Sequence, residues 1–325
     1  MNLLDLPSTP AADSGQAFDL DDDRAYRRWR DWKLAQLPVE ASTLVVHVQD
    51  PYRLSIAEKA ALIDRITRCN VAIYQMSTTG LQVTFEETPD KGLPQALGAQ
   101  LGLHRLDANW LADEDGVSSI QVRRAGGGGA GEGAHAAFIP YTDKAIRWHT
   151  DGYYHPAGRT IHAMVLHCVR PAARGGVNTL LDHELAYISL RDRDPALVRA
   201  LMRPEVMTIP ARDDDQGVAR AAQTGPVFSV LGGRLHMRYT ARKRSIAWRD
   251  DEATRRAVAA LEGVLDDPAT PGRLQLQLQA GMGIVGHNVL HDRSSFDDDP
   301  TQPRLLYRAR FLDRCQVLDP PWLNG

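Results

Sequence analysis

Two histidines and one aspartate in this chain have the residue types and the spacing of a facial metal site. His149 and Asp151 stand two residues apart, and His291 follows much later in the chain. Side chains two apart on a strand point to the same face, so His149 and Asp151 could reach one ion together, with His291 supplied by an opposite strand. Two imidazoles and one carboxylate suit iron and leave the other face of the ion open. The sequence therefore predicts an iron site at these three residues.

A His-x-Asp pair alone is also typical of an ordinary hydrogen-bonded pair, so the prediction depends on the motifs around it. A Gly-Gly turn at 175–176 precedes the segment 177–182, and an asparagine stands three residues before His291. Arg304 lies 13 residues after His291, and Arg308 lies four residues further on. In order, spacing and flanking residues, these motifs resemble the TauD/TfdA (taurine dioxygenase-like) family of iron(II)- and 2-oxoglutarate-dependent dioxygenases. The resemblance covers about residues 135–315.

The resemblance implies a fold and a role for the residues of these motifs. The implied fold is a distorted double-stranded β-helix, or jelly roll, and the implied iron ligands are His149, Asp151 and His291. Arg304 matches the arginine that binds the distal carboxylate of 2-oxoglutarate, since a guanidinium can grip a carboxylate with two parallel hydrogen bonds. The turn after Gly-Gly usually supplies a second group to that carboxylate, and here either Asn178 or Thr179 could do so.

Three residues near the predicted metal are candidates for substrate contacts. Arg308 matches a position that contacts an anionic substrate group in some members of the family, but a structural arginine paired with an acid such as Asp182 is an equal alternative. Tyr153 and Tyr154 directly follow the first two ligands and could line the substrate pocket, or they could be packed aromatic residues. The basic run 242–244 is typical of a solvated face, with an anion-contacting loop as the alternative.

The composition of the chain agrees with a globular enzyme. The chain has 325 residues, of which 43% are hydrophobic and 24% charged, and a net charge of -3. These values predict a sizeable core and no strong attraction to nucleic acid or to an anionic membrane. Three cysteines without a CxxC pair suit a reducing cytoplasm, and neither a signal peptide nor an apolar run of about 20 residues is present. We therefore expect a cytoplasmic protein that acts on a small molecule, with homo-oligomer formation left open.

The elements that would position the site are short strands with helices at the margins. The patterns predict helices at 23–36, 55–69, 91–101, 182–190, 194–203 and 252–265. They predict strands at 43–48, 70–76, 161–169 and 273–279, and a hairpin at 227–239 with a Gly-Gly turn. Because strands and helices do not alternate regularly, this order favours an α+β fold with a mostly β core, a jelly roll with flanking helices.

The domain organisation follows from composition. Residues 1–22 are rich in Pro, Ser, Ala and Asp, which predicts a poorly ordered tail or one laid on a surface, and residues 23–325 form a single catalytic domain. The glycine run within 124–133 lacks the Lys-Ser/Thr of a P-loop, so we expect a flexible surface loop near the site. Residues 205–225 are expected to be another loop that supplies pocket residues.

The resemblance therefore implies an oxygenase that uses Fe(II), 2-oxoglutarate and O2. It would hydroxylate an unactivated C–H bond of a small polar substrate, either amino-acid-like or anionic, with release of succinate and CO2. Desaturation or cyclisation at the same site is an alternative outcome, and a non-catalytic jelly-roll binding protein is an alternative of another class. A zinc hydrolase is disfavoured, because the chain has no HExxH-type pair and Arg304 would then have no purpose.

Overall fold

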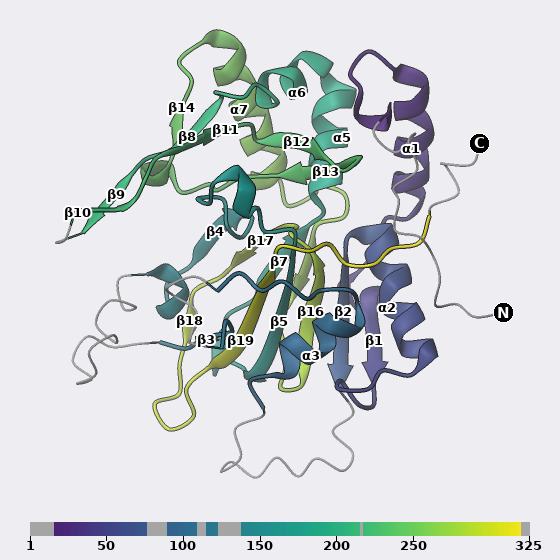
Figure 1. Ribbon diagram of the computed structural model, residues 1–325, viewed down its shortest axis with the longest axis vertical. Helices are drawn as coiled ribbons and strands as arrows, with labels where there is room; N and C mark the ends of the chain where they lie inside the picture. Colours follow the sequence, from purple (N-terminus) through teal and green to yellow (C-terminus); the bar gives the residue numbers. More distant parts are fainter. Residues whose placement is uncertain (1–15, 77–89, 109–114, 123–137, 215–216, 320–325) are drawn as a thin grey trace.

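Two facing β-sheets form the centre of the protein (Figure 1). The computed structural model describes residues 16–76, 90–108, 115–122, 138–214 and 217–319. The larger sheet has the order β1-β2-β16-β5-β19-β3, and the smaller has the order β15-β7-β17-β4. Apolar side chains of both sheets, such as Leu166, Leu180 and Leu306, pack into one core cluster. This arrangement agrees with the predicted jelly roll and its flanking helices.

Successive side chains of the larger sheet point alternately toward the smaller sheet and toward the outer face. The strands of this sheet are β1 (Val45–Val48), β2 (Val71–Met76), β16 (Met282–His287), β5 (Ala163–Arg170), β19 (Leu305–Phe311) and β3 (Ser118–Ile120). Along β19, Leu305, Tyr307 and Ala309 belong to the outer apolar cluster. Leu306 and Arg308 face the cavity between the sheets. The period of two therefore places every second residue of β19 toward the candidate site.

The smaller sheet carries the two predicted histidine ligands. Its strands are β15 (Leu274–Leu276), β7 (Asn178–Leu181), β17 (Leu290–Arg293) and β4 (Ile146–His149). The predicted strand 273–279 is shorter than expected, because β15 pairs with β7 only over three residues. Leu278 nevertheless stays buried, so the apolar alternation continues beyond the ladder.

Two helices cover the outer face of the larger sheet (Figure 1). They are α2 (Ile56–Cys69) and α3 (Leu93–Gln100), and both were predicted to within a few residues. In α2 the side chains of Ser55 and Glu58 form the expected capping box. The helix ends at Cys69 and is capped by Asn70, which adopts a left-handed conformation with φ of 59°.

Four further helices gather at one end of the molecule (Figure 1). They are α1 (Asp23–Ala35), α5 (His183–Arg193), α6 (Pro195–Leu201) and α7 (Glu252–Asp266). Tyr26 and Trp29 of α1 are buried and Trp32 is partly buried, so the predicted docking through aromatic residues is confirmed. Phe18, within the predicted tail 1–22, packs against Trp29 with ring centroids 4.9 Å apart. Residues 1–15 lie outside the described ranges, and the predicted division at residue 22 stays a prediction.

Short strands and turns complete the fold. The predicted hairpin is confirmed as β12 (Phe228–Leu231) and β13 (Arg234–Met237), with positive φ at both glycines of its turn. The segment 205–225 is not a plain loop, since it contains β8 (Met207–Ile209), β9 (Arg212–Asp214), β10 (Gly217–Arg220) and β11 (Gln223–Gly225). The remaining elements are β6 (Arg174–Gly175), β14 (Ala247–Trp248), β18 (Phe296–Asp297), η2 (Ala41–Leu44), η3 (Ile139–Tyr141), η4 (Ala157–Arg159) and η5 (Lys243–Ser245).

The sequence also predicted a flexible glycine loop and no membrane-spanning segment. The predicted glycine loop at 124–133 falls outside the described residues. Within the described part of the chain, no helix combines the length and the apolar character that a bilayer crossing requires.

Candidate active site

Antiparallel pairing brings the two predicted histidine ligands together. His149 is the last residue of β4 and His291 lies in β17, and the two are direct partners in the β17–β4 ladder. Their ring centroids are 4.2 Å apart. Residues that face each other across a strand pair project to the same side of the sheet. The second histidine therefore comes from the neighbouring strand of the same sheet and not from a strand folded opposite, as the sequence had suggested.

The position of Asp151 corrects the prediction that it shares a strand with His149. The strand β4 ends at His149, and Asp151 lies in the turn that follows. Gly152 continues this turn with φ of 67°, and a Cβ at this position would come within 2.4 Å of Ile161. Only glycine suits both restrictions. The turn still brings the carboxylate to the histidines, because one potential ligand atom from each of the three residues lies within 4.8 Å of the others.

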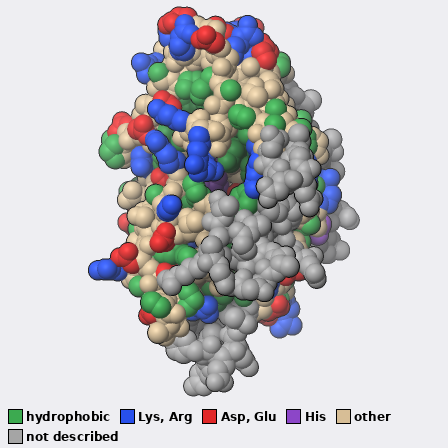
Figure 2. Space-filling view, turned by 90° about the vertical axis from the view of Figure 1, so that its left-hand side faces the viewer, with side chains coloured by type: hydrophobic (Ala, Val, Ile, Leu, Met, Phe, Trp, Pro, Cys, Tyr) green, Lys and Arg blue, Asp and Glu red, His purple; other side chains and the backbone are tan. Residues whose placement is uncertain are grey.

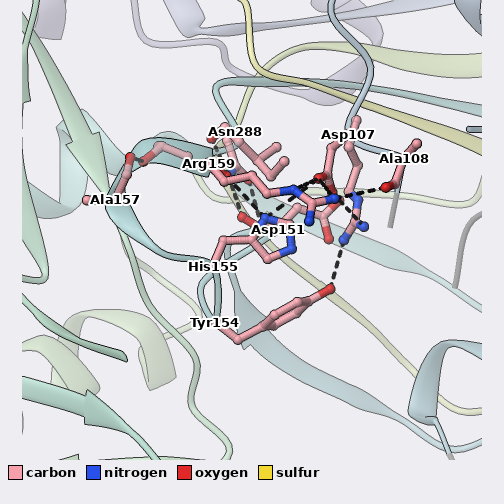
Figure 3. A network of polar contacts seen from close by, with 11 residues as sticks. Asp107, Ala108, Asp151, Tyr154, His155, Ala157, Arg159 and Asn288 are labelled. Carbon is pink, nitrogen blue, oxygen red and sulfur yellow. Dashed lines mark hydrogen bonds and ion pairs between the residues drawn. The ribbon is translucent and has the colours of Figure 1, made fainter. Parts of the chain in front are cut away.

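Asn288 ties the turn to the strand that carries His291 (Figure 3). Its Oδ1 accepts a hydrogen bond of 2.7 Å from the backbone N–H of Asp151, and its Nδ2 donates one of 2.7 Å to the carbonyl of the same residue. The same Nδ2 donates to the carbonyl of Ile161 at 2.9 Å. The sequence motif contained this asparagine but gave it no role. In the structure it fixes the backbone of Asp151 relative to His291, three residues further along the chain.

The donor atoms of the three residues fit a metal ion. The Nδ1 of His149 lies 2.9 Å from the carbonyl of Arg147, and the Nδ1 of His291 lies 2.9 Å from the carbonyl of Val289. An imidazole whose Nδ1–H donates in this way presents the lone pair of Nε2 to a metal. The Oδ2 of Asp151 is buried and has no hydrogen-bond partner among the described residues. Two Nε2 atoms and one carboxylate oxygen are thus left for an ion.

Burial and neighbouring charges keep the His149 imidazole neutral and the Asp151 carboxylate ionised. Burial, together with the nearby His291 ring, lowers the pKa of His149 to about 3. Burial alone would raise the pKa of Asp151, but the guanidinium groups of Arg308 and Arg310 hold that pKa below its usual range. Neutral imidazole and ionised carboxylate are the protonation states that metal binding requires.

A cavity beside the triad lies between the two sheets. Its apolar wall includes Ile120, Met164, Leu166 and Leu306. Arg304 also lines the cavity, is 4% exposed, and stacks its guanidinium over the Phe296 ring at 4.9 Å. Burial lowers the pKa of Arg304 to about 10, and among the described residues its guanidinium forms no ion pair. A buried cation of this kind suits the carboxylate of a bound ligand.

The structure separates the two candidates that follow the Gly-Gly turn. Asn178 lines the cavity with Arg304, whereas Thr179 does not. Thr179 pairs with Asp292 in the β17–β7 ladder, and its backbone N–H donates to the Oδ1 of Asp292 at 3.1 Å. Because successive residues of a strand face opposite sides, Thr179 points away from the side that Asn178 and Arg293 share.

The other three predicted site residues have different surroundings. Arg308 lines the cavity and places its Nη1 3.0 Å from the Oδ1 of Asp151, so its acid partner is not Asp182. Tyr153 and Tyr154 pack edge to face with centroids 5.2 Å apart, on the segment after Asp151. Neither tyrosine contributes to the cavity wall between the sheets. Their contact with a substrate stays a prediction.

Comparison with known proteins links this geometry to a family. Residues 113–310 match the family described as taurine catabolism dioxygenase TauD, TfdA. A uridine-5'-phosphate dioxygenase from Streptomyces sp is 36% identical over 205 residues, which cover 61% of this chain and 70% of that protein. A uridine-5'-phosphate dioxygenase from Amycolatopsis sp is 35% identical over 178 residues, which cover 51% of this chain and 60% of that protein.

Solved structures with the same fold are non-heme iron oxygenases. The oxygenase OrfP in complex with Fe and alpha-ketoglutaric acid is 18% identical and superimposes with a TM-score of 0.56, covering 95% of this chain and 92% of that one. An asparagine oxygenase in complex with Fe(II), a hydroxyasparagine and succinate is 16% identical, with a TM-score of 0.53 and coverage of 90% and 92%. At these identities the likeness concerns the fold, and it confirms the predicted jelly roll.

Proposed function

Since this chain belongs to the taurine catabolism dioxygenase TauD, TfdA family, we propose that it is a dioxygenase of a nucleoside 5′-monophosphate. Family membership confirms the expected class of enzyme, an iron(II)- and 2-oxoglutarate-dependent oxygenase that uses O2. The substrate and the roles of individual residues are our proposal. Uridine 5′-monophosphate is the specific candidate, because the two relatives above carry that substrate in their names.

The free donor atoms support His149, Asp151 and His291 as the iron ligands. Arg304 and Asn178, which both line the cavity, would hold the distal carboxylate of 2-oxoglutarate. When bound, iron with 2-oxoglutarate and O2 supplies the oxidising chemistry, and the protein's part is to orient the substrate and to exclude water.

The positive charge of the cavity supports an anionic substrate. Its wall contains Arg293, Arg304 and Arg308 and one acid, Asp292, and the ligand Asp151 adds a second carboxylate at the triad beside it. The two charges of Fe(II) and those of the 2-oxoglutarate dianion cancel, so the loaded site would keep its positive excess. A phosphate group on the substrate would balance this excess, whereas a neutral sugar would not.

The mouth of the site is also basic. Figure 2 shows Lys and Arg side chains gathered beside a hollow in which a histidine is visible. Thr240 forms a β-bridge with His149, and the basic run 242–244 begins two residues after it. This placement favours the anion-contacting alternative for the basic run, which the sequence had ranked below a solvated face.

Turnover of matched probe substrates tests the proposal. The protein would be incubated with Fe(II), ascorbate, 2-oxoglutarate and O2, and succinate would be measured with uridine 5′-monophosphate, uridine, L-arginine or L-asparagine. We expect succinate formation to be stimulated by the nucleotide, with a product that gains one oxygen atom. Loss of two hydrogens instead would indicate desaturation or cyclisation, and stimulation by an amino acid alone would contradict the nucleotide.

Removal of a ligand is the control for the site. The His149→Ala variant should bind Fe(II) weakly and form no succinate above background, because one of the three donors is missing. Turnover by this variant at the rate of the wild type would show that the triad is not the metal site. No succinate from 2-oxoglutarate in the wild type with any of these substrates would favour the non-catalytic binding protein.

A further inference from the structure

A loop directly after the aspartate ligand is held from outside the metal site. This segment, residues 152–160, is called here the ligand loop. Its two ends are fixed by Asn288, which binds the backbone of Asp151 before the loop and the carbonyl of Ile161 after it. The loop contains η4 and carries Tyr154, His155 and Arg159. The side chains of His155 and Arg159 point to one buried group (Figure 3).

That group is Asp107, whose side chain is fully buried. Its Oδ1 accepts a hydrogen bond of 2.7 Å from the Nε of Arg159. Its Oδ2 lies 2.9 Å from a guanidinium nitrogen of Arg310, and the Nδ1 of His155 lies 3.8 Å from its Oδ1. The carboxylate therefore joins the ligand loop to β19, which carries Arg310.

Tyr154 gives the loop a second connection to the same strand. The Nη1 of Arg310 donates a hydrogen bond of 3.0 Å to the hydroxyl of Tyr154. Arg310 is 4% exposed, so the loss of these partners would leave its buried charge uncompensated. Its backbone carbonyl also accepts from the N–H of Asp107 at 2.8 Å. Side chain and backbone together hold Asp107 and Arg310 in one relative position.

The strand β19 thus contacts both the aspartate ligand and the loop that follows it. Arg308 contacts the carboxylate of Asp151 itself, at 3.0 Å. Arg310, two residues further and on the same face of the strand, contacts the loop that begins after Asp151. A shift of the loop relative to β19 would therefore move Asp151 relative to Arg308.

We propose that Asp107 and Arg310 form a clamp that positions the ligand loop, and through it the carboxylate of Asp151, for metal binding. Both are positioning residues, since neither belongs to the triad or to the wall of the cavity. The inference rests on the proposed role of Asp151 as an iron ligand. It gives Tyr154 a role that differs from the predicted substrate contact.

The clamp is tested by Fe(II) binding in the absence of oxygen, which requires no substrate. The variants are Tyr154→Phe, Asp107→Asn and the double variant, each compared with the full-length wild type. Tyr154→Phe removes only the hydroxyl that accepts from Arg310, so it should fold even if Asp107→Asn does not. Asp313→Asn is the matched control, because Asp313 binds Arg105 at 2.6 Å and lies near the same strand end without contacting the ligand loop.

We expect Tyr154→Phe and Asp107→Asn each to weaken Fe(II) binding by roughly tenfold, the lower end of the effect of residues that support metal ligands. The double variant should be no weaker than Asp107→Asn alone, because Asp107 holds Arg310 in place and its loss also disturbs the contact of Arg310 with Tyr154. Asp313→Asn should bind Fe(II) like the wild type. A further pair of variants tests Arg159. Arg159→Lys should lose less Fe(II) affinity than Arg159→Met, because a lysine can still pair with Asp107.

Three results would overturn the inference. Wild-type Fe(II) affinity in folded Tyr154→Phe would show that the loop needs no clamp. Additive losses in the double variant would show that the two residues act separately. If the wild type bound no Fe(II) at all, the proposed function would fail first and the clamp with it, whereas a failure of the clamp alone leaves wild-type Fe(II) binding intact.

Discussion

Arg308 holds one oxygen of the Asp151 carboxylate while the other oxygen stays free. The Nη1 of Arg308 lies 3.0 Å from Oδ1, and Oδ2 is buried without a partner among the described residues. An arginine at this position leaves a single carboxylate oxygen for the metal. It also balances the charge of a buried aspartate when no ion is bound.

This pair predicts that the stability of an Arg308→Met variant depends on the metal. Loss of one partner of a buried ion pair should lower the free energy of unfolding of the metal-free protein by about 3 kcal/mol. Fe(II) should restore much of this lost free energy, because the divalent cation balances the negative charge of Asp151 in place of Arg308. Urea unfolding with and without Fe(II), in the absence of oxygen, measures the difference.

The exposed pair Arg174–Asp297 provides a control for this measurement. Its side chains are 83% and 68% exposed, so Arg174→Met should change stability little in either state. If Arg308→Met were destabilised equally with and without Fe(II), the pairing with Asp151 would not serve the metal site.

The two residues after the Gly-Gly turn should differ in their effect on 2-oxoglutarate. Asn178 lines the cavity and Thr179 does not. A hydrogen bond to a charged group contributes about 1.5 kcal/mol or more, so Asn178→Ala should raise the KM for 2-oxoglutarate roughly tenfold. Thr179→Val should leave this KM within a factor of about two, because its side chain faces the other side of β7. A larger effect of Thr179→Val would reverse the assignment.

Arg304 should select the co-substrate by its distal carboxylate. In Arg304→Met, discrimination between 2-oxoglutarate and 2-oxovalerate, which lacks that carboxylate, should fall by about 100-fold, because a charge-assisted bond of about 3 kcal/mol is lost. The measurement is the ratio of kcat/KM for the two acids in wild type and variant. An unchanged ratio would place the distal carboxylate elsewhere.

The sequence predicted those parts of the site that depend on local pattern and motif order. His149 and His291 were identified because their spacing to Arg304 and to the asparagine at 288 is characteristic, and the strands β4 and β17 bring them together. Asp151 was placed on a strand because the period of two says which face a residue takes but not where the strand ends. The left-handed Gly152 marks that end, yet a glycine in the sequence does not specify its φ angle.

Residues whose roles depend on distant partners were missed. Asp107 is a lone aspartate in sequence, and its partners at 159 and 310 become visible only when β19 and the ligand loop pack together. Lys33 occupies a helix that was predicted to dock through aromatic residues. It is nevertheless buried, 2.6 Å from the carboxylates of both Asp182 and Glu184. Long-range ion pairs of this kind leave no periodic signal.

His167 gives the fold a predictable response to acid. It lies on β5, is 1% exposed and pairs its Nδ1 with the hydroxyl of Tyr74 at 3.1 Å. Burial lowers its pKa to about 4. Between about pH 6.5 and pH 4, His167 is therefore protonated in the unfolded chain but neutral in the folded chain. The contribution of neutral His167 to stability is complete above about pH 6.5 and is lost as the pH falls toward 4.

A His167→Gln variant should therefore lose less stability on acidification than the wild type. Glutamine can still bond to Tyr74 but does not titrate, while the other buried histidines respond equally in both proteins. Between pH 7.5 and pH 5, the wild type should lose about 2 kcal/mol more of its free energy of unfolding than the variant. Denaturant unfolding at the two pH values measures this difference, with the pH 7.5 value separating the packing cost of the substitution. Identical pH dependence would mean that His167 takes up a proton inside the folded sheet.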